Sequence, residues 1–213
     1  MYTVYGRATS SNVQALLWGM EELGLTYTRL DYGEVFGGLD TPEFRAMTPH
    51  GRIPVLKDGD TALWETPSIL RYLMSKHAND DIWPKDLLAR AQVDMWAEWA
   101  KRAIAEAFTS PVFWHTARTK RENRQPDVIA QNLQAFERNL AKLETRLDQH
   151  DYVCGNSLTL ADIQCGHVLY RYFDIENARA PLPAVRGYYD RLTERPAYQR
   201  SVMVSYDSLI GTF

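Results

Sequence analysis

The sequence predicts two structurally different halves, an α/β half followed by an all-helical half. Short β runs alternate with helical patterns over residues 1–78, whereas apolar residues recur only at helical spacing over residues 87–213. Between them, residues 79–86 contain a polar run that ends in a proline, a composition typical of a linker. We therefore expect an α/β domain at 1–78, a linker at 79–86 and a helical domain at 87–213.

The first half opens with a short strand over residues 2–5 and a helix over residues 11–23. That helix is predicted from apolar residues at helical spacing and a closing glycine: Val13, Leu16, Leu17, Met20 and Gly24. A second strand over residues 27–31 follows. A glycine-rich loop then leads to a short helix over residues 42–46, which completes a β-α-β-α series.

Two strands and a helix come next. A strand begins at Val55, and Asp58-Gly59 is a dipeptide that favours a tight hairpin turn, so a second antiparallel strand is expected after it. Thr66 is a good helix N-cap and Pro67 suits the first helical position, so a helix is expected from Thr66 to about His77. The complete β-α-β-α-β-β-α order is typical of a thioredoxin-like domain.

The second half shows only helical periodicity. Five apolar residues mark a long helix: Leu88, Ala91, Met95, Trp96 and Trp99. We expect Ser110-Pro111 to interrupt it, and a further helix over residues 128–147. Thr159-Leu160-Ala161-Asp162 resembles a capping box at the start of a buried helix. The role of this motif is structural, so we expect that replacing Asp162 impairs folding before it affects catalysis.

Composition excludes several classes of protein. With 213 residues, 45% of them hydrophobic, the chain can bury a sizeable core, and its net charge of −3 with scattered Lys and Arg argues against a nucleic-acid surface. It has no run of about 18 apolar residues and no basic-then-apolar leader. We therefore expect no membrane span and a cytoplasmic location. Cys154 and Cys165 fit neither a zinc site nor a redox pair, so reduced thiols are expected.

Residues 47–72 contain two features suited to a peptide-like ligand. Ile53-Pro54 stands at the entrance to a strand, where proline interrupts the ladder and leaves backbone groups available to another chain. Glu65-Thr66-Pro67 opens a helix, and a helix N-terminus with free N–H groups and a hydroxyl favours a carboxylate. One short segment thus offers a backbone-pairing edge beside an anion site.

The run Pro49-His50-Gly51-Arg52-Ile53-Pro54-Val55-Leu56, followed by Glu65-Thr66, resembles the glutathione-binding core of the cytosolic glutathione transferases. The order of elements is similar over essentially all of the chain. The resemblance implies that Pro54 is cis and that the Ile53 backbone pairs with the cysteinyl part of glutathione. It also implies that Glu65 and Thr66 hold the γ-glutamyl end. Most members carry Ser where this chain has Thr66, so the hydroxyl is kept.

Glutathione chemistry requires a thiolate at neutral pH. Lowering a thiol pKa of about 8.5 by two units takes about 2.7 kcal/mol. A hydroxyl hydrogen bond contributes about 1.5–3 kcal/mol and a helix dipole about 0.3–1 kcal/mol. Ser10-Ser11-Asn12 stands where the first helix begins and is similar to the Ser-type bacterial (theta- or nu-like) classes. The resemblance implies that Ser10 is catalytic, with Ser11 as the alternative and Asn12 as a further donor.

Other interpretations of this turn stay open. Ser and Asn before a helix are also ordinary N-caps. Tyr5 ends the first strand, where the Tyr-type classes keep their catalytic tyrosine, although a tyrosine followed by serines is more typical of a packing residue. No cysteine occurs before Cys154, which excludes the cysteine-type classes and a thioredoxin dithiol.

The remaining contacts follow from the same comparison. His50 and Arg52 are expected to bind the glycyl carboxylate as charged donors. In the alternative interpretation, both are solvated loop residues that do not contact the ligand. Phe36, in the glycine-rich loop, is expected to cover the ligand or to pack on its own domain. Four residues are expected to line the electrophile pocket, with helical core as the alternative for the aromatic ones: Phe108, Phe113, Trp114 and His115.

The resemblance therefore implies a glutathione transferase that joins the glutathione thiolate to a small hydrophobic electrophile. Glutathione would be the co-substrate, with no metal, no nucleic acid and no membrane, and the protein would form a homodimer. A glutathione-dependent disulfide reductase or peroxidase is the first alternative, and a non-catalytic binding module is the second. The identity of the electrophile is not readable from the sequence.

Overall fold

The computed structural model describes residues 1–213. Its strands β1 (Tyr2–Tyr5), β2 (Tyr27–Leu30), β3 (Val55–Asp58) and β4 (Thr61–Trp64) form one sheet in the order β2-β1-β3-β4. The β1 strand pairs with β2 in parallel and with β3 in antiparallel fashion, and β3 pairs antiparallel with β4. The turn of this hairpin falls one residue later than expected, because Asp58 is still part of β3.

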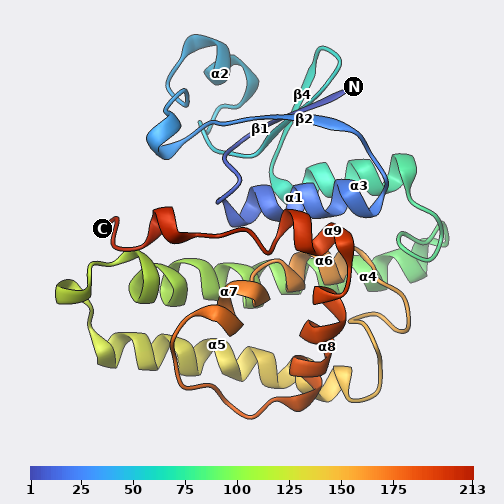
Figure 1. Ribbon diagram of the computed structural model, residues 1–213. Coiled ribbons are helices and arrows are strands. Elements are labelled where there is room, and N and C mark those ends of the chain that lie inside the picture. The colour runs from blue at the N-terminus through green and yellow to red at the C-terminus, as the bar shows by residue number, and fades with distance from the viewer.

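Three helices complete the α/β half: α1 (Ser11–Glu22), α2 (Pro42–Met47) and α3 (Thr66–His77). In Figure 1, α1 and α3 lie side by side between the sheet and the helical half, and α2 lies away from the helical half. Gly19 permits close contact of α1 with α3, since a Cβ there would stand 2.4 Å from a Leu70 methyl group. The predicted β-α-β-α-β-β-α order is confirmed, and residues 34–36 add one 3-10 turn.

The second half is entirely helical apart from one isolated bridge. It comprises α4 (Leu87–Ala100), α5 (Pro126–Leu147), α6 (Leu160–Gly166), α7 (Leu169–Asp174), α8 (Pro183–Thr193) and α9 (Pro196–Ser201). Short 3-10 turns occupy residues 121–123 and 207–209. The α6 helix packs against α1, α3 and α4, so it joins the core of one half to the other (Figure 1). No helix is both long and apolar enough to cross a membrane.

The prediction that Ser110-Pro111 interrupts the long helix is wrong. After α4 the chain continues as two π-helical segments, Lys101–Glu106 and Thr109–Arg118, and Pro111 lies inside the second. A proline has no N–H to donate within a helix. The wider π turn changes the hydrogen-bond pattern and accommodates the proline without ending the helix.

The capping motif at the start of α6 is present. The buried Asp162 carboxylate accepts from the Thr159 N–H at 2.8 Å and the Thr159 hydroxyl at 3.0 Å. It also accepts from the Val153 N–H at 2.8 Å and the Tyr188 hydroxyl at 3.0 Å. Burial raises the pKa of this carboxyl group, while the hydrogen bonds oppose the shift. Asp162 therefore ties the loop before α6 to α8.

Candidate functional site

A cavity of about 130 Å³ lies where the β1–α1 turn, the start of α3 and the first π-helical segment meet. Seven residues predicted for the site line it: Asn12, His50, Arg52, Ile53, Pro54, Glu65 and Thr66. Thr48, Trp64, Lys101 and Glu106 complete the lining. Residues far apart in the sequence therefore converge on one small polar cavity.

The Ile53-Pro54 peptide bond is cis, and β3 begins directly after it at Val55. Neither the N–H nor the carbonyl of Ile53 pairs with another backbone group of the chain. A buried or half-buried backbone group usually has a partner, so this pair is suited to the backbone of a bound peptide. The neighbouring His50 ring packs edge-on against Trp64 at 5.0 Å, and Arg52 is exposed.

The α3 helix spans Thr66–His77 as expected, but its N-cap is Glu65 and not Thr66. Glu65 has φ +66° and ψ 111°, a conformation that costs a non-glycine residue about 1–3 kcal/mol. Such strain concentrates at binding sites. The buried Thr66 hydroxyl lies 3.5 Å from the Asn12 carbonyl, and the N–H groups of Thr66 and Ser68 have no helical partner. This helix end can therefore accept a carboxylate.

Four lining residues were not among the predicted site residues, and two of them, Lys101 and Glu106, come from the π-helical segment Lys101–Glu106. The half-buried Lys101 ammonium donates to Asn12 Oδ1 at 2.7 Å. Burial lowers the pKa of Lys101, and the carboxylates of Glu106, Glu65 and Glu98 partly oppose that shift. No local sequence signal places a helical lysine opposite the β1–α1 turn, because the contact joins segments 89 residues apart.

The β1–α1 turn contains both candidate serines, and neither belongs to the lining of the cavity. Ser10 is the N-cap of α1, and its oxygen accepts a long hydrogen bond of 3.5 Å from the Val13 N–H. Capping uses a lone pair of the oxygen, so the Ser10 O–H can still donate to a ligand. Ser11 is the first helical residue and is equally buried. The Tyr5 ring packs edge-on against Tyr32 at 5.2 Å, as a packing residue would.

The four predicted electrophile-pocket residues differ in burial. Phe108 is fully buried and packs against Phe136, with ring centres 5.2 Å apart, so the structure places it in the helical core. Phe113 is also buried. Trp114 and His115 are exposed, and the His115 ring nitrogen Nδ1 lies 3.0 Å from the Ser110 carbonyl oxygen. Phe108 and Phe113 therefore lie in the helical core, whereas Trp114 and His115 lie at its surface.

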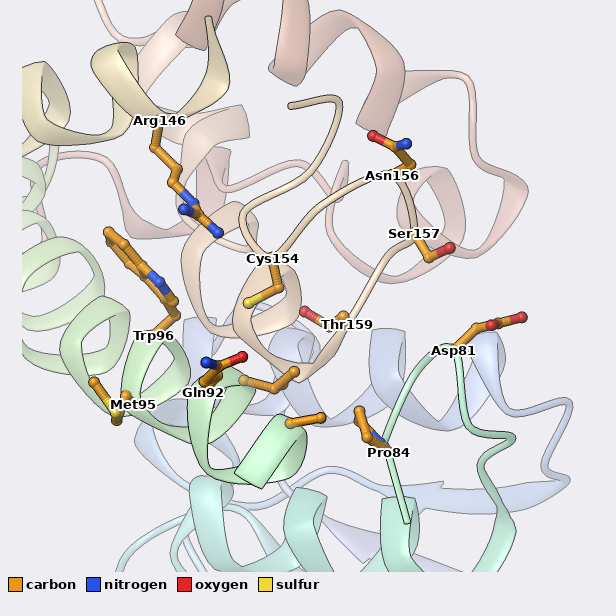
Figure 2. Close-up of a pocket in the computed structure, with 12 residues that line it drawn as sticks. Asp81, Pro84, Gln92, Met95, Trp96, Arg146, Cys154, Asn156, Ser157 and Thr159 are labelled. Atoms are coloured by element: carbon orange, nitrogen blue, oxygen red, sulfur yellow. The ribbon is translucent and has the colours of Figure 1, made fainter. Parts of the chain in front are cut away.

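Phe36 is 53% exposed on its 3-10 turn and does not line the cavity. A second cavity of about 520 Å³ lies between α4 and the loop before α6 (Figure 2). Figure 2 shows Trp96, Arg146 and Cys154 around it, and none of the predicted site residues belongs to its lining. Burial raises the pKa of Cys154 to about 11, so this thiol is protonated at neutral pH.

Comparison with known proteins identifies the family to which the chain is similar. A family model for the glutathione S-transferase N-terminal domain matches residues 4–81, and one for the C-terminal domain matches residues 126–191. The chain is 31% identical over 206 residues to glutathione S-transferase GstB of Escherichia coli strain K12, which covers 96% of this chain and 99% of that protein.

Solved structures are similar as well. The theta class glutathione S-transferase of Xanthomonas axonopodis pv. citri, with glutathione bound, matches with a TM-score of 0.90 and 38% identity, over 96% of this chain and 98% of that one. Glutathione S-transferase I from maize, in complex with an atrazine glutathione conjugate, matches with a TM-score of 0.84 and 25% identity, over 95% and 96% of the two chains.

Proposed function

The chain belongs to the glutathione S-transferase family and is a glutathione-conjugating enzyme, and from this premise we propose how its own residues perform the reaction. Glutathione occupies the cavity beside α3, and its thiolate is stabilised at the N-terminus of α1. The observation that carries this proposal is the convergence of seven predicted residues on that one cavity.

The γ-glutamyl end binds at the start of α3. The Glu65 carboxylate pairs with the α-ammonium group of glutathione. The α-carboxylate accepts hydrogen bonds from the Thr66 hydroxyl and from the backbone N–H groups of Thr66 and Ser68. Supporting this, Glu65 holds a strained backbone conformation at the edge of the cavity, and a helix N-terminus favours an anion. Lys101 holds the Asn12 side chain in place beside the γ-glutamyl end.

The remainder of the tripeptide follows β3. The free N–H and carbonyl of Ile53 pair with the cysteinyl backbone, which directs the thiol toward α1. His50 and Arg52, both exposed at the other side of the cavity, bind the glycyl carboxylate. Three separate contacts therefore fix the position of the sulfur atom.

Ser10 donates its hydroxyl hydrogen to the sulfur. One hydrogen bond to a charged acceptor contributes about 1.5–3 kcal/mol, which lowers a thiol pKa by one to two units. The thiol proton is lost to solvent, and the thiolate attacks an electrophilic carbon. A carbon–sulfur bond forms as the bond to the leaving group breaks, and the leaving group departs with the electron pair.

The reaction type is tested by comparing three substrates under the same conditions. We expect kcat/KM for 1-chloro-2,4-dinitrobenzene to exceed that for hydroxyethyl disulfide and for cumene hydroperoxide. A higher kcat/KM with the disulfide would show that the main activity is disulfide reduction and not conjugation. Glutathione binding without turnover of any of the three would identify a binding module.

We also propose a cytoplasmic homodimer, as implied by the family. The exposed apolar side chains Leu87, Leu88 and Met95 on α4, together with Trp64 of β4, are suited to such an interface. Light scattering coupled to size-exclusion chromatography should give twice the mass of the 24.5 kDa chain. A monomer mass at all micromolar concentrations would contradict the dimer.

A further inference from the structure

Three arginines from separate segments surround the turn that carries Ser10. Arg7 lies in the turn itself, Arg118 ends the second π-helical segment, and Arg171 belongs to α7. The Arg171 guanidinium donates to the Thr9 carbonyl at 2.7 Å, one residue before Ser10. We refer to Arg7, Arg118 and Arg171 as the arginine cluster.

The arginine cluster is largely buried and incompletely hydrogen-bonded. Arg118 and Arg171 are 5% and 3% exposed. The Nε–H groups of Arg7 and Arg171 are buried and have no hydrogen-bond partner. Buried polar groups are nearly always satisfied, and a guanidinium donor without an acceptor is costly in a protein interior. The cluster therefore has spare donors that favour an additional acceptor.

The charges of the cluster are not balanced. Glu34 is the one carboxylate that pairs with it, at 2.7 Å from Arg7 and 2.8 Å from Arg118. Arg171 forms no ion pair and lies against the Phe113 ring, with its guanidinium carbon 4.6 Å from the ring centre. Burial lowers the pKa of Arg171 to about 10, and Arg7 and Arg118 add to the shift. Arg171 is thus still cationic at neutral pH, and one carboxylate faces three cations.

We propose that the arginine cluster is an anion subsite on the electrophile side of the active site, which binds a carboxylate carried by the electrophilic substrate. The inference rests on the proposed function, because it places the reactive carbon of that substrate beside the sulfur held at Ser10. A guanidinium pairs with a carboxylate through two parallel hydrogen bonds, so the cluster fixes both the position and the orientation of such a substrate.

Glu34 acts as the internal counter-ion that the substrate replaces. Its side chain is 29% exposed and that of Arg7 is 14% exposed, so the pair forms the solvent-facing side of the cluster. Glu34 has φ +53° and lies between Gly33 and Gly37, both with positive φ. The strained Glu34 backbone and its flexible glycine neighbours allow the carboxylate to leave the arginines at low cost.

An aryl chloride with a carboxylate on the ring illustrates the reaction. The thiolate attacks the ring carbon that bears chlorine, a carbon–sulfur bond forms, and chloride leaves with the electron pair of the carbon–chlorine bond. The carboxylate keeps its charge and takes no part in bond making. Its contact with the arginine cluster would lower the KM for the electrophile.

Binding tests the subsite without any turnover. Calorimetric titration with 3-nitrobenzoate and the uncharged 3-nitrobenzamide should give at least about tenfold tighter binding of the benzoate, as expected for one charge-assisted pair. Arg7→Gln and Arg118→Gln should each abolish this preference. Glu34→Gln should tighten benzoate binding at least about threefold, because the internal carboxylate no longer competes. Arg186→Gln is the matched control, since Arg186 is exposed and paired with Asp190 at 2.9 Å.

Turnover then separates this inference from the proposed function. The substrates are 4-chloro-3-nitrobenzoate and 4-chloro-3-nitrobenzamide, and each catalysed rate is divided by the uncatalysed rate of the same substrate with glutathione. In the native protein this ratio should be higher for the benzoate. Equal binding of the two nitro compounds, or a preference that survives in folded Arg7→Gln and Arg118→Gln, overturns the subsite. Failure to conjugate either aryl chloride, with the binding preference intact, contradicts the proposed function and leaves the subsite established.

Discussion

Lys101 of the helical half donates to Asn12 of the α/β half, with 2.7 Å between Nζ and Oδ1. This contact crosses from the first π-helical segment to the first turn of α1, directly beside Glu65 and Thr66. The amide oxygen of Asn12 is thereby engaged, which leaves its N–H groups directed away from Lys101. In the proposed binding mode, the helical half contributes to glutathione binding by orienting a residue of the other half.

Lys101→Met should weaken glutathione binding while the fold persists. The substitution keeps most of the apolar stem and removes the charge-assisted hydrogen bond to Asn12, so the KM for glutathione should rise about three- to tenfold. Steady-state kinetics with varied glutathione measures this change. Lys142→Met, at an exposed position on α5, is the control. An unchanged KM in Lys101→Met would show that the contact is structural only.

Ser10→Ala should lower kcat at least about tenfold, because the hydrogen bond to the thiolate is lost. The KM for glutathione should stay within a few-fold, since the three anchoring contacts are untouched. Ser11→Ala is the matched comparison, one residue further along and equally buried. If Ser11→Ala or Tyr5→Phe causes the larger loss of kcat, the assignment of Ser10 is wrong.

Glu65→Ala should raise the KM for glutathione at least about tenfold through loss of the ion pair with the α-ammonium group. The exposed Asp60→Ala, in the turn between β3 and β4, changes the net charge by the same amount at a site outside the cavity. Its KM should match that of the native protein. Similar KM values for Glu65→Ala and the native chain would remove Glu65 from the binding site.

Asp162→Ala should destabilise the protein by at least about 3 kcal/mol. It leaves the buried N–H groups of Thr159 and Val153 and the Tyr188 hydroxyl without an acceptor, and each costs about 1–3 kcal/mol. Urea unfolding measures the loss. Asp190→Ala, exposed on α8, is the control. A near-native free energy of unfolding would contradict the capping role, and the kcat of the folded fraction should not change.

His167 should make the protein sensitive to acid. Burial lowers its pKa to about 3, with smaller contributions from Lys101 and Arg171, against about 6.5 in an unfolded chain. Between those values the unfolded chain binds a proton that the folded chain does not, so the free energy of unfolding falls as pH falls. The loss attributable to His167 between pH 7.5 and pH 5 is about 2 kcal/mol, and it is absent above pH 7.

The test is urea unfolding at both pH values for the native chain, His167→Gln and the exposed His115→Gln. His167→Gln should lose about 2 kcal/mol less than the native chain on acidification, and His115→Gln should behave like the native chain. Identical losses in all three proteins would mean that His167 is not held neutral by the fold.

The elements with local signals were predictable from the sequence. The Asp162 motif, the Gly24 helix end and the strand at Val55 each depend on neighbours within a few residues, and the structure has them within about one residue. The N-cap of α3 is Glu65 and not Thr66, because Glu65 adopts a positive φ that a sequence pattern does not favour for glutamate. Ser10 is the N-cap of α1, as the local preference of serine favours, whereas its catalytic role was inferred from the family resemblance and stays a prediction.

The long-range parts of the site were not predictable in this way. Lys101 meets Asn12 across 89 residues, and Arg171 meets Thr9 across 162 residues. Helical spacing shows which face of a helix is apolar but not which partner it meets. For the same reason Phe108 could have been either core or lining, and packing against Phe136 places it in the core. The helix interruption predicted at Pro111 is absent, because a π turn accommodates the proline.

A spectroscopic titration measures whether Ser10 makes the bound thiol of glutathione a nucleophile. The ultraviolet absorbance of the thiolate is followed from pH 5 to pH 9 with glutathione bound to the native chain and to Ser10→Ala. We expect the bound thiol to titrate one to two units below its free pKa in the native chain and to return toward the free value in Ser10→Ala. Tight binding with no shift, or the same shift in both proteins, would contradict it.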